Sequence, residues 1–187
     1  VVLPRHLRSD EVDYECELAV VIGKRCKNVP KDQALDCVLG YTCANDVSAR
    51  DWQKERGGGQ WCRAKGFDTF CPLGPWIVTA DEIPDPYDLD LELTVNGEKR
   101  QISNTSHMSV TLPQIISKFS PAGYSAGDIV TTGTVAGVAA FSANPQAWYL
   151  KPGDVIEAQI EKIGTLRNRV VSWQEGHGKP APAWQGF

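Results

Sequence analysis

Three carboxylates occupy positions from which they could act together. Glu15 and Glu17 lie two residues apart in the apolar run 13–23, and Asp46 ends a second short apolar stretch. The run predicts a β-strand, in which residues i and i+2 point to the same face. Like charges held close together and partly buried repel and lose hydration, so a proton, a basic side chain or a divalent cation must neutralise them. Carboxylate oxygens suit a hard cation such as Mg²⁺, Mn²⁺ or Ca²⁺.

The Glu-x-Glu pattern alone has a second interpretation. Solvated edge strands also carry paired glutamates, with no ion between them. The apolar residues on both sides of Glu15 and Glu17 strengthen the metal interpretation, and at this point both interpretations stay open.

The length and composition indicate one ordinary globular domain. A chain of 187 residues with a formal net charge of −4 gives no electrostatic reason to expect nucleic acid or an anionic membrane as a partner. No apolar run approaches the ~20 residues needed to cross a bilayer, and the start does not resemble a signal peptide. The chain begins with Val1 rather than Met, as a processed or truncated product would.

The six cysteines are expected to be reduced, buried thiols. None forms a C-x-x-C pair, and most lie in apolar segments of a chain large enough to fold without disulfides. This pattern predicts an intracellular compartment, with the cytoplasm and the mitochondrion both left open.

Hydrophobic periodicity predicts a mainly β domain with a few short helices (an α+β fold) and a mixed sheet. Strands are expected at 13–23, 40–46, 75–79, 89–95, 98–102, 128–134 and 154–160. Asn96-Gly97 predicts a tight hairpin between two of them. Helices are expected at 31–39, at about 47–53 and at 112–119. The domain is expected to span 1–171, and 172–187, rich in Gly, Pro and Trp, is expected to be an extended tail.

Several ordered motifs resemble those of a known family. Asp13 to Lys24 resembles the opening signature of the fumarylacetoacetate hydrolase family, and Asn45 to Gln53 resembles its second block. Further blocks follow in family order at 65–75, at 95–98 with 104–105, at 127–134 and at 150–154. The segments Asp51-Trp52-Gln53 and 67–75 are most similar to the domain-containing protein 2 branch. The resemblance covers about residues 12–171, and it implies a β-roll of the family's C-terminal domain type and a homodimer.

The resemblance also implies roles for individual residues. Metal ligands would be Glu15, Glu17 and Asp46; a catalytic lysine would be Lys65; substrate would contact Gln53, Gly133 and Thr134. The ammonium of Lys65 would balance the carboxylates and stabilise developing negative charge. Arg50 is expected to order the carboxylates or to pair at an interface.

The function implied is that of a Mg²⁺-dependent enzyme acting on a small 2-oxo acid. Metal-chelated enolate chemistry would serve acylpyruvate-type C–C bond hydrolysis, oxaloacetate decarboxylation or keto–enol isomerisation, so the enzyme would be a hydrolase, lyase or isomerase. The alternative is a non-catalytic, metal-stabilised, truncated paralogue that acts as a dimerising domain.

Two departures from the family pattern bear on hydrolysis. Hydrolytic members activate water with a His–Glu pair upstream of the first block, and this chain begins only about a dozen residues before Glu15. His6 is too close to the strand to take that role, and His107 and His177 are interpreted as surface or packing residues. The fifth block continues as 135–139, without the family's usual proline, which alters the loop beside the expected substrate carboxylate.

Overall fold

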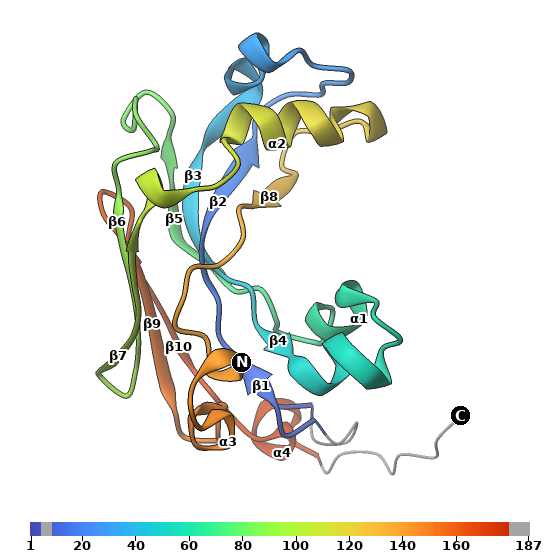
Figure 1. The fold of residues 1–187 in the computed structure, drawn as a ribbon, viewed down its shortest axis with the longest axis vertical. Coiled ribbons are helices and arrows are strands. Elements are labelled where there is room, and N and C mark those ends of the chain that lie inside the picture. The colour runs from blue at the N-terminus through green and yellow to red at the C-terminus, as the bar shows by residue number, and fades with distance from the viewer. Residues whose placement is uncertain (5–8, 180–187) are drawn as a thin grey trace.

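The computed structural model describes residues 1–4 and 9–179. Two four-stranded sheets form the body of the molecule, and a two-stranded sheet lies at one end (Figure 1). The first sheet has the order β5-β3-β2-β8 and the second the order β10-β9-β6-β7. All pairings of the named strands are antiparallel, and a parallel bridge joins Val2 to Val171.

The strands are short and are connected mostly by turns. They are β1 (Val12–Asp13), β2 (Cys16–Ile22), β3 (Val38–Asn45), β4 (Ser48–Ala49), β5 (Leu73–Thr79), β6 (Asp90–Val95), β7 (Glu98–Asn104), β8 (Ile129–Thr131), β9 (Val155–Ile160) and β10 (Gly164–Arg169). The α-helices are α1 (Trp61–Lys65), α2 (Leu112–Phe119), α3 (Pro145–Trp148) and α4 (Trp173–His177). The prediction of a mainly β fold with a few short helices is confirmed. The predicted mixed sheet is not found, because the named strands of both sheets pair only in antiparallel fashion.

Strand β2 runs through the middle of the first sheet, between β3 and β8, and all seven of its residues are buried. Cys16, Leu18 and Val20 belong to the hydrophobic core between the sheets. Side chains alternate along a strand, so Glu17 points to the opposite face. One strand therefore supplies both the core and a carboxylate that faces away from it.

The second sheet is built on the predicted hairpin. Asn96 and Gly97 both have positive φ (54° and 78°), as a two-residue turn of the hairpin type requires. Along β6 the buried positions alternate, with Leu91, Leu93 and Val95 facing the core. This alternation is what one buried sheet face produces.

Helix α2 matches the predicted range 112–119. The side chain of Gln114 accepts a hydrogen bond from the Thr111 backbone N–H, which fixes the start of the helix. Leu112 and Ile116 lie one turn apart and are buried, so this face anchors the helix across the upper end of the first sheet (Figure 1).

The predicted strand 128–134 forms only the three-residue β8, and the sequence interpretation missed β10 and α1. Four further local predictions differ from the structure. The predicted strand 13–23 is two strands, because the chain leaves β1, which pairs with β4, and enters β2, which pairs with β3. The predicted helix 31–39 is two single 3₁₀ turns, Lys31–Gln33 and Leu35–Cys37, followed directly by β3. These turns bury only Cys37, so no apolar face exists to hold a longer helix.

The other two differences lie at 47–53 and near the C-terminus. The segment after Asp46 forms β4 before a helical stretch that includes a π-helix at Trp52–Arg56. The expected extended tail contains α4, capped by the Ser172 side chain, which accepts from the Glu175 N–H. His6 and the end of the tail lie outside the described residues.

All six cysteines are free thiols, but the expectation of burial holds for only three of them: Cys26 and Cys71 are partly buried and Cys62 is exposed. Among the described residues, no helix has the length and apolar character that crossing a membrane demands.

Gly137 marks a tight contact between the loop that follows β8 and strand β7. Its φ is +108°, and a Cβ there would lie 2.0 Å from the carbonyl oxygen of Arg100. Neither the backbone conformation nor the space admits a side chain. The loop after β8 is therefore held against β7 at this point.

We expect Gly137→Ala to lower the free energy of unfolding by at least about 2 kcal/mol, because strain and steric overlap add. Gly153→Ala is the matched control, since Gly153 has φ +99° and a Cβ added there would have nothing within 4 Å. Urea unfolding of both variants separates the backbone strain, which both share, from the steric overlap with the Arg100 carbonyl, which only Gly137→Ala has. Equal losses in the two variants would show that the contact with Arg100 is unimportant.

Candidate metal and active site

Glu15, Glu17 and Asp46 meet at one point of the first sheet. One carboxylate oxygen of each lies within 4.8 Å of the others. Glu17 is on β2, Glu15 lies between β1 and β2, and Asp46 follows β3 directly. Glu15 and Glu17 are buried and Asp46 is partly buried.

Backbone geometry brings these three residues together. Cys16 pairs with Asn45 in the β2–β3 ladder, so the residues that flank this pair are neighbours. The N–H of Asp46 donates to the carbonyl oxygen of Glu15 (2.9 Å), and the N–H of Glu15 donates to the side-chain oxygen of Asn45 (2.9 Å). The break between β1 and β2 frees the Glu15 N–H for this side-chain contact.

Lys65 lies between two of the carboxylates. It is the last residue of α1, and its Nζ is 2.7 Å from Glu15 Oε2 and 2.6 Å from Asp46 Oδ2. Burial works to lower the pKa of the ammonium, but the hydrogen bonds to Asp46 and Glu15 outweigh it and the pKa of Lys65 is raised. Lys65 is therefore a fixed positive charge in the site.

Arg50 holds Glu15 from the other side. Its Nη2 is 2.7 Å from Glu15 Oε1, and its Nε is 2.9 Å from Asp13 Oδ2. Its Nη1 donates to Gln53 Oε1 (2.9 Å). Arg50 and Asp13 are almost completely buried. Removal of either partner would leave the other as an unpaired buried charge, which would strongly destabilise the fold.

Glu17 has no ion-pair partner among the described residues. Its Oε2 accepts a hydrogen bond from the Gly133 N–H (2.7 Å). Burial first, and then the charges of Asp46 and Glu15, raise the pKa of Glu17 to about 8. The pKa of Asp46 is also raised by burial, although Lys65 opposes the shift.

These features fit a divalent cation. The donors are hard carboxylate oxygens, and Glu17 is a buried acid that has no ion-pair partner among the described residues. Glu15, Glu17 and Asp46 are the residues that would hold the ion. Their role as ligands remains a prediction, as does the identity of the metal.

The expected substrate-binding residues are all near the cluster, with part of their hydrogen-bonding capacity in use. Gly133 gives its N–H to Glu17, and the Thr134 hydroxyl is 3.3 Å from the carbonyl oxygen of Cys16. Gln53 Oε1 is bound by Arg50. The substrate roles of these three residues stay predictions.

Gln101 is a residue that the sequence interpretation missed. It lies on β7 and is fully buried. Its Oε1 accepts from the Cys16 N–H (2.8 Å), and its Nε2 donates to Thr134 Oγ1 (2.9 Å) and to the Val135 carbonyl (2.8 Å). It therefore ties the backbone between Glu15 and Glu17 to the loop that carries Gly133.

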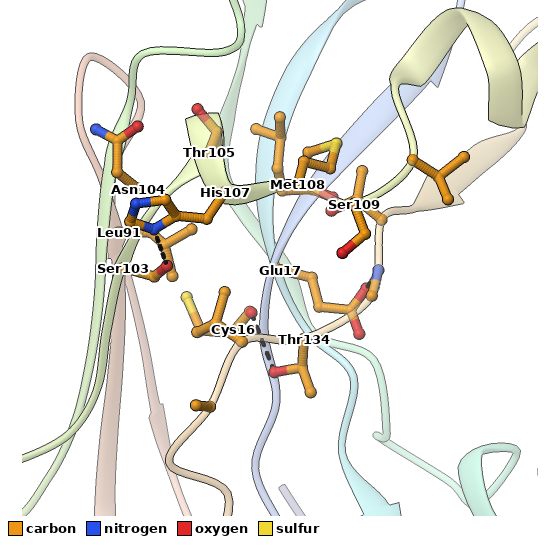
Figure 2. Close-up of a pocket in the computed structure, with 16 residues that line it drawn as sticks. Cys16, Glu17, Leu91, Ser103, Asn104, Thr105, His107, Met108, Ser109 and Thr134 are labelled. Carbon is orange, nitrogen blue, oxygen red and sulfur yellow. Dashed lines mark hydrogen bonds between the residues drawn. The ribbon is translucent and has the colours of Figure 1, made fainter.

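A cavity of about 340 Å³ opens beside Glu17 (Figure 2). It lies between the loop after β8 and the segment that follows β7, which includes the 3₁₀ turn Thr105–His107. His107, expected to be a surface or packing residue, is exposed and lines this cavity, with Nδ1 3.3 Å from Ser103 Oγ. His177 is on α4, 3.5 Å from a carboxylate oxygen of Asp68 and away from the cavity.

The family model described as fumarylacetoacetate (FAA) hydrolase, C-terminal, matches residues 1–171. This chain belongs to the fumarylacetoacetate hydrolase family. The match covers the carboxylate cluster, Lys65 and the loop after β8, so the resemblance drawn from the sequence motifs is confirmed.

Individual members of the family are close in sequence and structure. A 2,4-didehydro-3-deoxy-L-rhamnonate hydrolase of Sphingomonas sp. is 50% identical over 93% of this chain and 60% of its own length. An oxaloacetate tautomerase of Xenopus laevis, fahd2, described as mitochondrial, is 48% identical over 87% of this chain and 51% of its own. The solved fumarylacetoacetate hydrolase of Exiguobacterium antarcticum is 42% identical with a TM-score of 0.85, over 91% of this chain and 60% of that one.

The chain spans about half to three-fifths of the length of these relatives. The named members of this family include hydrolases, isomerases and a tautomerase.

The raised pKa of Glu17 predicts how stability depends on pH. Without metal, the folded carboxyl has a pKa of about 8 and the unfolded one its ordinary value of 4.5, so the folded state binds the proton more tightly. Tighter proton binding by folded Glu17 therefore stabilises the folded state fully at low pH. This stabilisation is lost as the pH rises from about 5 to about 8.5. We expect the melting temperature in EDTA to fall over this interval and Mg²⁺ to restore it.

Glu17→Gln is the control for this pH dependence. The variant cannot ionise at position 17, so its metal-free melting curve should depend less on pH and respond less to Mg²⁺. An unchanged slope in Glu17→Gln would assign the pH dependence to other groups.

Replacement of Gln101 by Leu tests whether the buried amide positions the ligands. Unpaired buried groups at Cys16, Thr134 and Val135 should cost about 1–3 kcal/mol of stability. Loss of the support behind the ligands should weaken Mg²⁺ binding about 10-fold or more. Calorimetric Mg²⁺ titration checks this, with Gln159→Leu on the exposed face of β9 as control. Wild-type affinity in folded Gln101→Leu would contradict the positioning role.

Proposed function

We propose that this domain is the catalytic part of a divalent-metal-dependent enzyme that acts on a small 2-oxo acid. The observation that carries the proposal is the arrangement of three clustered carboxylates with the Lys65 ammonium between two of them. Mg²⁺ is the proposed ion, and Mn²⁺ or Ca²⁺ would suit the same ligands. Relatives named for acting on a 2-oxo sugar acid and on oxaloacetate support this substrate class.

Each of the described residues has a separate role in the proposed site. A bound divalent cation supplies Lewis acidity, which polarises a carbonyl oxygen. Lys65 stays protonated and places a positive charge where negative charge would develop, while Arg50 fixes the orientation of Glu15. Gln53 keeps its Nε2 amide without a hydrogen-bond partner in the described chain, so this group is a donor for substrate.

Stabilised negative charge next to a carbonyl is common to hydrolysis of a C–C bond, decarboxylation and keto–enol isomerisation. Hydrolysis additionally needs a group that activates water. The two histidines in the described parts of the chain, His107 and His177, make no hydrogen bond or ion pair with the three carboxylates. The described residues therefore support decarboxylation and isomerisation more directly than hydrolysis.

A homodimer is proposed for the whole protein. Strand β5 lies at the edge of the first sheet and exposes Leu73, Trp76 and Ile77. An apolar sheet edge of this kind suits self-association.

The function is tested by following the ultraviolet absorbance of the enol of oxaloacetate and of a short acylpyruvate. We expect turnover that requires Mg²⁺ and falls at least about 100-fold in Glu17→Gln and in Lys65→Met, because each loses a charge that acts at the reacting atoms. Glu157→Gln on β9 is the matched control and should keep full activity.

Two results would contradict the proposal. Turnover that is independent of Mg²⁺ or of Glu17 would assign the chemistry to another site. No turnover in folded protein that Mg²⁺ stabilises would favour the alternative, a metal-stabilised domain without catalytic activity.

A further inference from the structure

Two of the six free thiols lie next to each other at the end of the first sheet that α2 crosses (Figure 1). Cys26 lies in the segment that follows β2, and Cys37 ends the 3₁₀ turn that directly precedes β3. The side chains of Cys26 and Cys37 hydrogen-bond with each other. They lie beyond the end of β2, whereas the carboxylate cluster is at its start.

Backbone hydrogen bonds hold both cysteines in this arrangement. The Gly23 N–H donates to the Cys37 carbonyl (2.7 Å), which closes the base of the segment 23–37. Cys26 and Tyr124 exchange both of their backbone hydrogen bonds (3.1 and 2.8 Å). The two thiols are therefore brought together by the ordered backbone on each side of them.

The two thiols differ in their access to solvent. Cys26 is partly buried, so a reagent in solution can reach its sulfur atom. Cys37 is only 4% exposed and belongs to the hydrophobic core. A reagent would therefore attack or be attacked at Cys26 first, and Cys37 would react afterwards with Cys26.

The side chains around Cys26 favour an anionic reagent. Lys24, Arg25 and Lys27 are all exposed, and they concentrate positive charge in a chain whose formal net charge is −4. The carboxylate of Asp128 is the acidic group that acts on Cys26. Glutathione disulfide has more carboxylates than ammonium groups, so the basic side chains would raise its local concentration.

The Cys26 thiol is protonated at neutral pH. Burial, and next the hydrogen bond with Cys37, raise its pKa to about 11, while the positive charge of Lys24 opposes the shift. The thiolate is the attacking form, so oxidation is expected to be slow at neutral pH and faster in mildly alkaline solution.

We propose that Cys26 and Cys37 form a modification site, at which glutathione disulfide oxidises the two thiols to an intramolecular disulfide. The Cys26 thiolate attacks one sulfur of glutathione disulfide, whose S–S bond breaks and releases one glutathione thiolate. The Cys37 thiolate then attacks the Cys26 sulfur of the mixed disulfide and releases the second glutathione. The two thiol protons pass to the two glutathione thiolates, and the two electrons that the cysteines lose reduce one glutathione disulfide.

The cross-link would close the loop between residues 26 and 37, about a dozen residues long, at the end of the first sheet. A disulfide across a loop of this length restricts the unfolded chain, so the melting temperature should rise by about 5–10 °C. Reduction by dithiothreitol should reverse the rise.

Incubation of the folded full chain with excess glutathione disulfide at mildly alkaline pH tests the proposal. We expect peptide mapping by mass spectrometry without reductant to show a peptide that joins Cys26 to Cys37, with the loss of two hydrogen atoms. Cys62 is an internal control, because it is exposed and its thiol contacts Gln60 rather than another thiol. It should carry bound glutathione instead.

Single variants separate the two steps. Cys37→Ala, which keeps an apolar side chain at the buried position, should accumulate glutathione on Cys26, because the second thiol is missing. In Cys26→Ser, Cys37 should stay unmodified. Cys62→Ser is the matched control and should form the cross-link and gain the same melting temperature as the wild type.

Three results for the wild-type chain would overturn the proposal. The first is stable glutathione on Cys26 with Cys37 left as a thiol. The second is modification of Cys62 while both Cys26 and Cys37 stay reduced. The third is a cross-link that appears only when urea unfolds the chain, which would show that the two thiols do not meet in the folded protein. All three are read from the wild type, so they hold even where a variant fails to fold.

Discussion

Glu15 and Asp46 share one ammonium group, and the arrangement of the site depends on that sharing. Each carboxylate is within hydrogen-bonding distance of Lys65, and Glu15 is held on its other side by Arg50. Without these two cations, three acids packed against a sheet would repel one another and lose hydration. Glu17 has no such cation beside it, and its one hydrogen bond among the described residues comes from the Gly133 N–H, so burial and its acidic neighbours raise its pKa to about 8.

The cluster is stabilised by elements that lie far apart in the sequence. Arg50 is neutralised by Asp13, which also accepts from the Ala139 and Ala140 N–H groups at the start of a 3₁₀ turn. Gln101 joins the second sheet to the first at Cys16. The three carboxylates are thus held by residues from both sheets. Their burial costs free energy, and the same burial keeps their geometry rigid.

The sequence indicates the charged residues of the site better than the residues that hold them in position. Strand periodicity pointed to Glu15 and Glu17 as neighbours, although Glu15 lies between β1 and β2. Asp46 joins them through the pairing of β2 with β3, which no local signal reports. The position of Lys65 came from the family motif, since α1 is only five residues long and has little periodicity. Gln101 carries no local signal at all: a glutamine in a strand is usually solvated, and only the packing of β7 against the loop after β8 makes it a buried clamp. The predicted helix at 31–39 was wrong because periodicity cannot report whether an apolar face has anything to pack against.

The ends of the domain are joined to each other. The Leu3 N–H donates to the Val171 carbonyl, the Val171 N–H donates to the Val1 carbonyl, and the Val2 N–H donates to Thr69 Oγ1 (2.7 Å). Thr69 lies four residues after Lys65, which ends α1, so the first residues of the chain are attached to the loop that follows this helix. Because Val2 donates to the Thr69 hydroxyl, the first residues of the domain and the loop that follows α1 hold each other in place, although more than sixty residues separate them in the sequence.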